Sequence, residues 1–221
     1  MPKLPEETAV GIDLNVKNFL TDSNKKVVDN PKYYRRMEFR LNKAKRKMSK
    51  RQARAKKEKR PLAKAKNYQK QRLLVARLSR KVTNQRKNFL HELAKAYLKN
   101  HEIVVAEEFR SKNLLKNHKI AKSLQDVGHR TFLTLLEQKA QMYGRTFLTV
   151  NPKNTTQTCS ACGHIMSGES KLTLKDRKWT CPVCQTHHDR DHNASVNVLK
   201  RGLSILDKQT SVGNARINCI S

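Results

Sequence analysis

Four of the five cysteines form two Cys-x-x-Cys pairs, and this arrangement constrains the fold more than any other feature of the 221-residue sequence. The pairs are Cys159 with Cys162 and Cys181 with Cys184, with 18 residues between them. This spacing is typical of a four-thiolate zinc ribbon, in which each pair closes a tight knuckle and a hairpin joins the two knuckles. Four thiolates leave no open coordination position, so we expect structural zinc rather than catalytic zinc.

Several residues near the cysteine pairs have alternative interpretations. A redox-active or merely buried pair of cysteines is the weaker alternative to zinc binding. His164, His187 and His188 lie near enough in sequence to replace a cysteine as a zinc ligand. Trp179 is the only tryptophan, and we expect it to pack against the knuckle rather than to stack on a nucleobase.

The charge of the chain indicates the class of its partners. There are 48 Lys and Arg residues against 18 Asp and Glu, and the formal net charge is +30. Of these, 26 basic residues and three acidic residues lie between positions 31 and 100. We expect no signal peptide from the polar MPKLPEET start, and the sequence contains no run of about 18 apolar residues. The composition therefore favours a cytoplasmic nucleic-acid-binding protein without a membrane partner.

The basic segment has the apolar periodicity of two helices. Apolar residues recur at helical spacing in two stripes, broken near Pro61: Tyr34, Met37, Leu41, Ala44 and Met48, and then Leu74, Leu78, Val82, Phe89, Leu93 and Tyr97. We expect a helical hairpin that buries these stripes and exposes its basic side chains. The candidate contacts to a nucleic-acid backbone are Lys43, Arg46, Lys47, Arg51 and Arg54.

The remaining segments alternate between strand and helix patterns. Residues 9–29 predict two or three antiparallel strands, and strands are also expected at 103–109 and 145–150. Helices are expected at about 129–143 and from about Asn193 to Arg201, and a Lys- and Asn-rich loop is expected after the strand at 103–109. This order predicts an α/β fold around a mixed sheet of about five strands.

Three acidic residues stand in positions that suggest chemistry. Asp13 lies in the apolar segment VGIDL and Glu107 ends the apolar segment IVVAE, where an ionised side chain is costly unless it binds something. Asp191 at the start of the last helix is the third candidate. Oxygen ligands of this kind suit Mg²⁺ or Mn²⁺ and two-metal phosphodiester hydrolysis. From the residues alone, Glu108 or Asp189 could replace its neighbour as a ligand.

Six segments resemble, in order, the C-terminal half of the TnpB family of insertion-sequence-encoded, RNA-guided DNA nucleases. They are GIDLNVKNF, NQRKNFLHELA, IVVAEEFRSKNL, YGRTFLTVNPKNTTQTCSACGH, WTCPVCQTHHDRDHNAS and NVLKRG. The resemblance covers residues 9–202. It implies an RNase H-like RuvC domain with a long basic helical insertion and an inserted zinc ribbon that binds target nucleic acid.

The resemblance also implies roles for individual residues. The catalytic triad of the family falls on Asp13, Glu107 and Asp191, all of which are acidic here, so a live nuclease is expected. Arg190 matches the arginine of the family's DRD motif and is expected to contact phosphates of the scissile strand, with an ordinary surface arginine as the alternative. The departures are Asn15 for a common Gly, Glu108 for a common Asp and Ser195 for a common Ala, and none of them removes a ligand.

Six segments are expected from the resemblance. They are the first RuvC strands (1–30), the basic helical insertion (31–100), further RuvC strands and a helix (101–152), the zinc ribbon (153–188), the last RuvC helix (189–204) and a C-terminal tail (205–221). The tail contains Cys219, which we assign no role. The barrel and recognition lobe that precede these segments in the family are not expected in this sequence.

The function implied is an RNA-guided DNA endonuclease with structural zinc and catalytic Mg²⁺ or Mn²⁺. Its partners would be DNA, guide RNA and either full-length TnpB or a separate recognition-lobe polypeptide, near the nucleoid of a bacterial or archaeal cell. The alternatives are an N-terminally truncated, non-cleaving nucleic-acid-binding fragment that regulates the full-length nuclease, and a decayed reading frame. Metal-dependent cleavage distinguishes the first function from the other two.

Overall fold

The computed structural model describes residues 8–15, 17–109, 128–173 and 175–217, with the side chains of 210–217 excepted. The chain forms two compact units: residues 31–92 make up one, and the segments before and after them make up the other. The predicted Lys- and Asn-rich loop and Cys219 lie outside the described residues.

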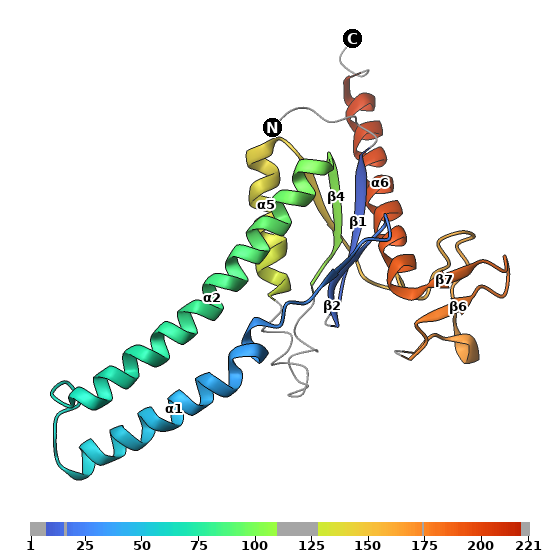
Figure 1. Cartoon of the computed structure of the whole chain (residues 1–221). Coiled ribbons are helices and arrows are strands. Elements are labelled where there is room, and N and C mark those ends of the chain that lie inside the picture. The colour runs from blue at the N-terminus through green and yellow to red at the C-terminus, as the bar shows by residue number, and fades with distance from the viewer. Residues whose placement is uncertain (1–7, 16, 110–127, 174, 218–221) are drawn as a thin grey trace. The chain divides into compact units, whose positions relative to one another are not determined.

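The larger unit is built on a five-stranded mixed sheet in the order β3-β2-β1-β4-β5 (Figure 1). Strands β1 (Ala9–Leu14), β2 (Asn18–Asp22) and β3 (Val27–Asp29) form an antiparallel meander. Strands β4 (Ile103–Glu107) and β5 (Thr146–Val150) run parallel to β1. The mixed sheet of about five strands predicted from the sequence is confirmed.

Helix α6 (Arg190–Ile217) packs closely on one face of this sheet. A Cβ atom built on Gly11 of β1 would lie 2.2 Å from the Ser195 carbonyl oxygen, so only glycine allows this approach. Further along the helix, Val198 joins Val105 and Val150 of the sheet in a buried cluster. These contacts hold the first turn of α6 beside the ends of β1 and β4.

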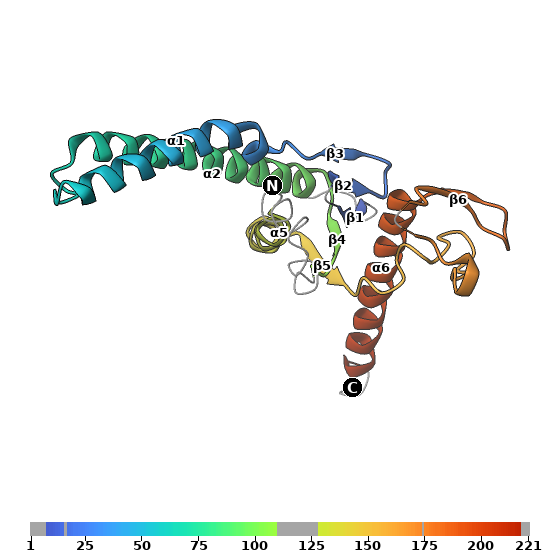
Figure 2. The same cartoon turned by 90° about the horizontal axis from the view of Figure 1, so that it is seen from below.

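Helix α5 (His129–Tyr143) lies on the other side of the sheet from α6, as two perpendicular views show (Figures 1 and 2). Its buried residues include Phe132 and Leu136, and the Phe132 ring meets the Phe19 ring edge-on at 5.2 Å. The helix ends at Gly144, which adopts a left-handed conformation with φ of 63°. The bounds of this helix match the sequence prediction.

The last helix is longer than the sequence analysis predicted. It begins at Arg190 instead of about Asn193, and it continues to Ile217, well past Arg201. The half-buried Leu199, Leu203 and Leu206 continue the apolar face at helical spacing, and no proline interrupts it. Residues 205–217, which were assigned to the C-terminal tail, thus continue the last helix.

The smaller unit is a helical hairpin of α1 (Tyr33–Lys57) and the part of α2 (Lys66–Asn100) that precedes Leu93. Pro61 lies in the connection, as predicted. Leu41 and Ala44 of α1 pack with Leu78 of α2 in the buried cluster between the helices. The predicted stripe is wrong at Leu74, which is 40% exposed.

The polar Gln71 takes a buried position on this face of α2. Its side-chain amide donates a 3.1 Å hydrogen bond to the Ala44 carbonyl oxygen, which makes its burial tolerable. A hydrophobicity pattern cannot anticipate such a polar contact between the helices.

None of the helices in the described part of the chain is long and apolar enough to span a membrane.

Candidate active site and cysteine cluster

The four predicted cysteine ligands converge in one small module. Their sulfur atoms all lie within 4.8 Å of one another, with 3.6 Å between Cys159 and Cys184 and 3.6 Å between Cys162 and Cys181. A short antiparallel pair, β6 (Lys178–Thr180) and β7 (His187–Asp189), frames the second knuckle. Four sulfur ligands at this spacing are typical of structural zinc.

A small apolar core surrounds the cluster. Trp179 is buried with Cys159, Met166 and Cys181, which agrees with the packing role expected for it. The Trp179 ring also stacks at a tilt on His188, with ring centroids 4.6 Å apart. The buried indole stiffens the module and leaves little aromatic surface for a base.

Two further polar contacts bear on the ligand set. The His188 ring nitrogen Nε2 lies 3.1 Å from the Cys159 sulfur, so His188 is the histidine that reaches the cluster. Burial lowers the pKa of His188, and the nearby His192 and His187 charges lower it further. Hydrogen bonds with Thr186 lower the pKa of the Cys184 thiol to about 6. For Cys162, a backbone hydrogen bond that lowers the pKa is outweighed by desolvation and by hydrogen bonds with the other three cysteines, which raise the pKa to about 12. Metal binding requires the thiolate form of both residues.

The predicted catalytic acids Asp13, Glu107 and Asp191 lie on elements that meet where the inner strands β1 and β4 end. We call this place the acidic edge of the sheet. β1 and β4 are parallel neighbours, with Ile12 opposite Ala106, so Asp13 and Glu107 follow side by side at their carboxyl ends. Both residues fall on the α6 face, because side chains alternate and Gly11 and Val105 contact α6. Asp191 stands in the first turn of α6.

The pKa of Asp13 reflects the electrostatic environment of the acidic edge. Its side chain is buried, and burial raises its pKa well above the usual range. The charges of Glu107 and Asp191 raise that pKa further, while the Arg190 charge and the Asn15 side chain act in the opposite direction. Asp13 therefore interacts with both of the other acids from a poorly solvated position.

Glu107 is oriented by a threonine from the segment that leads into the cysteine module. The Thr155 hydroxyl donates a 2.5 Å hydrogen bond to the Glu107 carboxylate. Burial raises the pKa of Glu107, and the Thr155 hydrogen bond and the Arg201 charge offset part of that increase. Glu108, the alternative ligand, is exposed and does not contribute to the pKa shift of Asp13.

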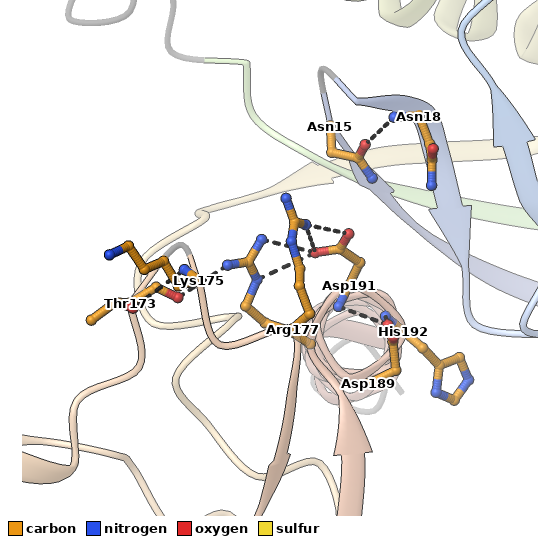
Figure 3. A network of polar contacts seen from close by, with 9 residues as sticks. Asn15, Asn18, Thr173, Lys175, Arg177, Asp189, Asp191 and His192 are labelled. Carbon is orange, nitrogen blue, oxygen red and sulfur yellow. Dashed lines mark hydrogen bonds and ion pairs between the residues drawn. The ribbon is translucent and has the colours of Figure 1, made fainter.

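Asp191 is engaged by two arginines. Arg177 Nη1 lies 3.0 Å from Asp191 Oδ2 (Figure 3). Arg190 Nη2 lies 3.2 Å from Asp191 Oδ1. The buried Arg190 also donates to the Thr173 carbonyl oxygen. Arg190, expected to contact a phosphate, thus bonds to a neighbouring carboxylate here.

The remaining alternative ligand, Asp189, caps the last helix. Its carboxylate accepts hydrogen bonds from the backbone N–H groups of Asp191 at 3.2 Å and His192 at 3.1 Å (Figure 3). These bonds satisfy helix-terminal donors and fix the start of α6. Within the described residues, only the four cysteines form a cluster with all ligand atoms within 4.8 Å, so the three acids are neighbours without forming such a cluster.

Sequence reasoning missed the residues that join the cysteine module to this edge. Asn193 accepts a hydrogen bond from the Ser160 N–H at 2.9 Å and donates to the Thr158 carbonyl at 2.8 Å. Asn197, one turn later, donates to the carbonyls of Thr155 and Thr158. Both asparagines lie in segments that resemble TnpB, Asn193 in DRDHNAS and Asn197 at the start of NVLKRG, and this was the available sequence signal for their role.

The five contacts to a nucleic-acid backbone that were predicted in the helical insertion all lie on α1. Lys43, Arg46 and Lys47 are exposed and line one cavity. Arg51 donates to the Asn67 carbonyl at 2.8 Å, and Arg54 forms an exposed ion pair with Glu58. The helix therefore presents a basic surface that is partly ordered by its own contacts.

The architecture thus defines a mixed α/β protein with a four-cysteine module beside an acidic sheet edge. A family model described as "Probable transposase" (OrfB of IS605) matches residues 1–118, and a model described as "Cas12f1-like, TNB domain" matches residues 129–198. The chain belongs to this OrfB transposase family, to which TnpB also belongs, and the TnpB resemblance is confirmed.

Related proteins are about twice as long as this chain. One from Streptomyces pristinaespiralis, named "Putative RNA-guided DNA endonuclease", is 36% identical over 89% of this chain and 46% of its own length. A protein of Escherichia coli K12, "Putative RNA-guided DNA endonuclease InsQ", is 26% identical over 93% of this chain and 52% of its own. The chain spans about half the length of these relatives.

A solved structure supports the same fold. It is a cryo-electron microscopy structure of a complex of Cas12f1 with sgRNA and target DNA, and its match has a TM-score of 0.53 at 22% identity. The match covers 90% of this chain and 51% of that chain.

Proposed function

We propose that this chain carries the catalytic centre of an RNA-guided DNA endonuclease of the TnpB type. Its sheet would be an RNase H-like, RuvC-type sheet, with Asp13, Glu107 and Asp191 as the ligands of two Mg²⁺ or Mn²⁺ ions. The sheet order, the family and the names of the relatives all support this assignment.

The single observation that carries the proposal is the environment of Asp13. A buried carboxylate whose pKa is raised by two further carboxylates is unfavourable in an isolated protein, and a bound cation would relieve the repulsion. The three side chains offer only oxygen donors, which fits the preference of Mg²⁺ and Mn²⁺. Bound ions would supply an activated water and charge stabilisation for phosphodiester hydrolysis.

The protein side chains would orient the site. Thr155 holds the Glu107 carboxylate through its hydroxyl, and the cap by Asp189 fixes the turn that bears Asp191. Arg177 and Arg190 hold Asp191 in this structure, and their guanidinium groups are suited to phosphate when a strand is bound.

The cysteine module would be a zinc ribbon whose ion is structural. Its hydrogen bonds to Asn193 and Asn197 attach it to the first turns of α6, and its residue Arg177 reaches Asp191. Folding of the module would therefore determine the position of groups at the acidic edge.

The expected partners are DNA and a guide RNA. The basic α1, with the candidate contacts Lys43, Arg46, Lys47, Arg51 and Arg54, suits a phosphate backbone, and the solved Cas12f1 complex contains sgRNA and target DNA. Sequence would be specified by base pairing with the guide rather than by the protein.

The test is cleavage of labelled single-stranded DNA by zinc-loaded protein with Mg²⁺ or Mn²⁺. The Asp13→Asn, Glu107→Gln and Asp191→Asn variants should lose cleavage, while Glu108→Gln, the matched neighbour, should retain it. If Glu107→Gln retains cleavage and Glu108→Gln loses it, Glu108 rather than Glu107 is the metal ligand. Salt-sensitive binding by the wild type without any cleavage would instead favour a nucleic-acid-binding protein that does not cut.

A further inference from the structure

Phe39 on α1 is the most exposed of the large hydrophobic residues in the described part of the chain, at 81%. Isolated exposed apolar residues are common on proteins and need no explanation by themselves. Phe39 differs from them because its aromatic ring is surrounded by cationic side chains on a strongly basic helix. Its surroundings, rather than its exposure alone, indicate what it binds.

The neighbours of Phe39 form one stripe along the helix. Asn42, Lys43, Arg46, Lys47 and Lys50 follow it at helical spacing and line, together with Phe39, a cavity of about 380 Å³. Four of these five residues are cationic, and no acidic residue lines the cavity.

The stripe faces away from the core of the hairpin. A helix turns about 100° per residue, which puts Phe39 and Lys43 roughly opposite Leu41 and Ala44. Leu41 and Ala44 are the buried residues that pack on Leu78. Packing within the hairpin therefore accounts for the opposite face of α1 and leaves the Phe39 stripe unexplained.

We infer that the Phe39 stripe is a binding site for an unpaired nucleotide of a nucleic-acid strand. The Phe39 ring would stack on the base, the Asn42 amide would meet the base edge, and the four cations would hold the adjoining phosphates. A paired base would offer neither face, because both faces are stacked within the duplex.

This inference rests on the proposed function, since it assumes a nucleic-acid partner, and it adds a base-dependent contact to a helix otherwise expected to bind backbone alone. A surface of cations alone would bind any polyanion according to its charge. An aromatic ring adds a preference for strands with unstacked bases, in either RNA or DNA.

The test compares four labelled probes of one length: single-stranded DNA, single-stranded RNA, duplex DNA and an abasic DNA strand. Phe39→Ala should weaken binding of the two base-bearing single strands by about 5- to 30-fold, and binding of the abasic strand and the duplex should be unchanged. The ratio of the RNA and DNA losses identifies which strand uses the site.

Matched variants separate stacking from charge and from general hydrophobicity. Phe39→Trp should retain binding, and base-bearing strands should quench the fluorescence of the new indole. The wild type is the reference for this signal, because its tryptophan, Trp179, is buried. Phe39→Leu should behave like Phe39→Ala. Lys43→Ala should weaken the binding of all four probes to a similar extent and reduce the salt dependence of their affinity. Met142→Ala, at a residue 77% exposed on α5, should change nothing.

Two results would overturn the inference. One is equal binding of all four probes by Phe39→Ala and wild type; the other is a change of oligomeric state in Phe39→Ala, which would show that the ring packs on protein. Cleavage is measured in the same samples. If the protein cleaves DNA and Phe39→Ala has no base-dependent effect, only the Phe39 site is refuted. If binding depends on the bases through Phe39 but no cleavage occurs, only the proposed nuclease function is refuted.

Discussion

Replacing Asp13 with asparagine should stabilise the protein when no divalent cation is added. Burial raises the pKa of the Asp13 carboxyl, and the charges of Glu107 and Asp191 raise it further. Above the usual pKa of a carboxyl group, the folded state therefore holds Asp13 at a cost that the unfolded chain does not experience, either as a strained carboxylate or by keeping a proton. Asparagine has nearly the same shape and carries no charge, so it removes this strain.

The magnitude follows from linkage. Each unit by which folding raises a carboxyl pKa lowers the free energy of unfolding by about 1.4 kcal/mol at pH values above both pKa values. We expect Asp13→Asn to raise the free energy of unfolding by about 1–2 kcal/mol, which is the range of other changes that relieve strained active sites. For a protein of this size the Tm should rise by roughly 2–8 °C.

The pH dependence gives the sign of the effect. The folded pKa of Asp13 is raised, so ionisation destabilises the fold as pH increases from the unfolded value of about 4 through the folded value. Below pH of about 4 the carboxyl is protonated in both states, and wild type and Asp13→Asn should be equally stable. The advantage of Asp13→Asn should appear as pH increases.

The assay is thermal unfolding of zinc-loaded protein in buffer stripped of divalent ions by a resin, because a soluble chelator would also remove zinc. Adding Mg²⁺ at 100 times its Kd should stabilise wild type by about 2.7 kcal/mol. The same addition should have much less effect on Asp13→Asn, which lacks one ligand. Magnesium should therefore reduce or reverse the difference in Tm.

Asp22→Asn is the matched control on the neighbouring strand. Asp22 is also buried, but its carboxylate accepts hydrogen bonds from the Tyr97 hydroxyl at 2.8 Å and from the backbone N–H groups of Asn24 and Lys26 at 2.9 Å. This change should destabilise by about 1.5–3 kcal/mol, with or without Mg²⁺. If Asp13→Asn lowers the metal-free Tm as Asp22→Asn does, the reasoning about strain at the acidic edge is refuted.

Three further predictions concern other parts of the structure. Cys181→Ser should remove stoichiometric zinc, measured by atomic spectroscopy, and expose residues 153–188 to proteolysis; retained zinc would contradict a four-cysteine site. Gly11→Ala would place a Cβ atom 2.2 Å from the Ser195 carbonyl oxygen and should lower stability by about 1–3 kcal/mol in thermal unfolding; an unchanged Tm would mean that α6 moves freely on β1. Arg177→Gln frees Asp191 of one ion pair and should raise Mn²⁺ affinity by about 1.5- to 5-fold in a paramagnetic resonance titration, whereas weaker binding would indicate that Arg177 orients the ligand.

Local pattern predicted most of the fold because the strands are continuous apolar segments with sharp ends. The segments around Asp13 and Glu107 each form a buried strand with an acid at its carboxyl end, and parallel pairing brings such ends to one edge. The periodicity of the helical hairpin and the position of Pro61 likewise predicted α1 and α2.

The two errors have different causes. The longer α6 had a local signal, because Leu199, Leu203 and Leu206 continue its apolar face at helical spacing, and the sequence prediction ended the helix too early. Gln71 is buried because the Ala44 carbonyl accepts its hydrogen bond, and a hydrophobicity count would place Leu74 there instead. The burial of Gln71 depends on a partner that is distant in sequence.

The candidate site shows the same limit. The cysteine spacing predicted the cluster correctly, since two knuckles bring four thiolates together with little freedom. Spacing could not distinguish Asp189 from Asp191, and only the structure shows that Asp189 caps the helix. The pairing of Arg177 with Asp191 has no sequence signal, because it joins the cysteine module to another element.

The central claim is that Asp13, Glu107 and Asp191 bind the catalytic cation. Anomalous diffraction from crystals of zinc-loaded protein soaked in Mn²⁺ tests it most directly. We expect manganese peaks about 2.0–2.3 Å from the carboxylate oxygens of these three residues, with the Arg177 guanidinium displaced from Asp191. A structure in which Mn²⁺ is absent from this edge, with Asp191 still paired to Arg177 at saturating metal, would contradict the claim.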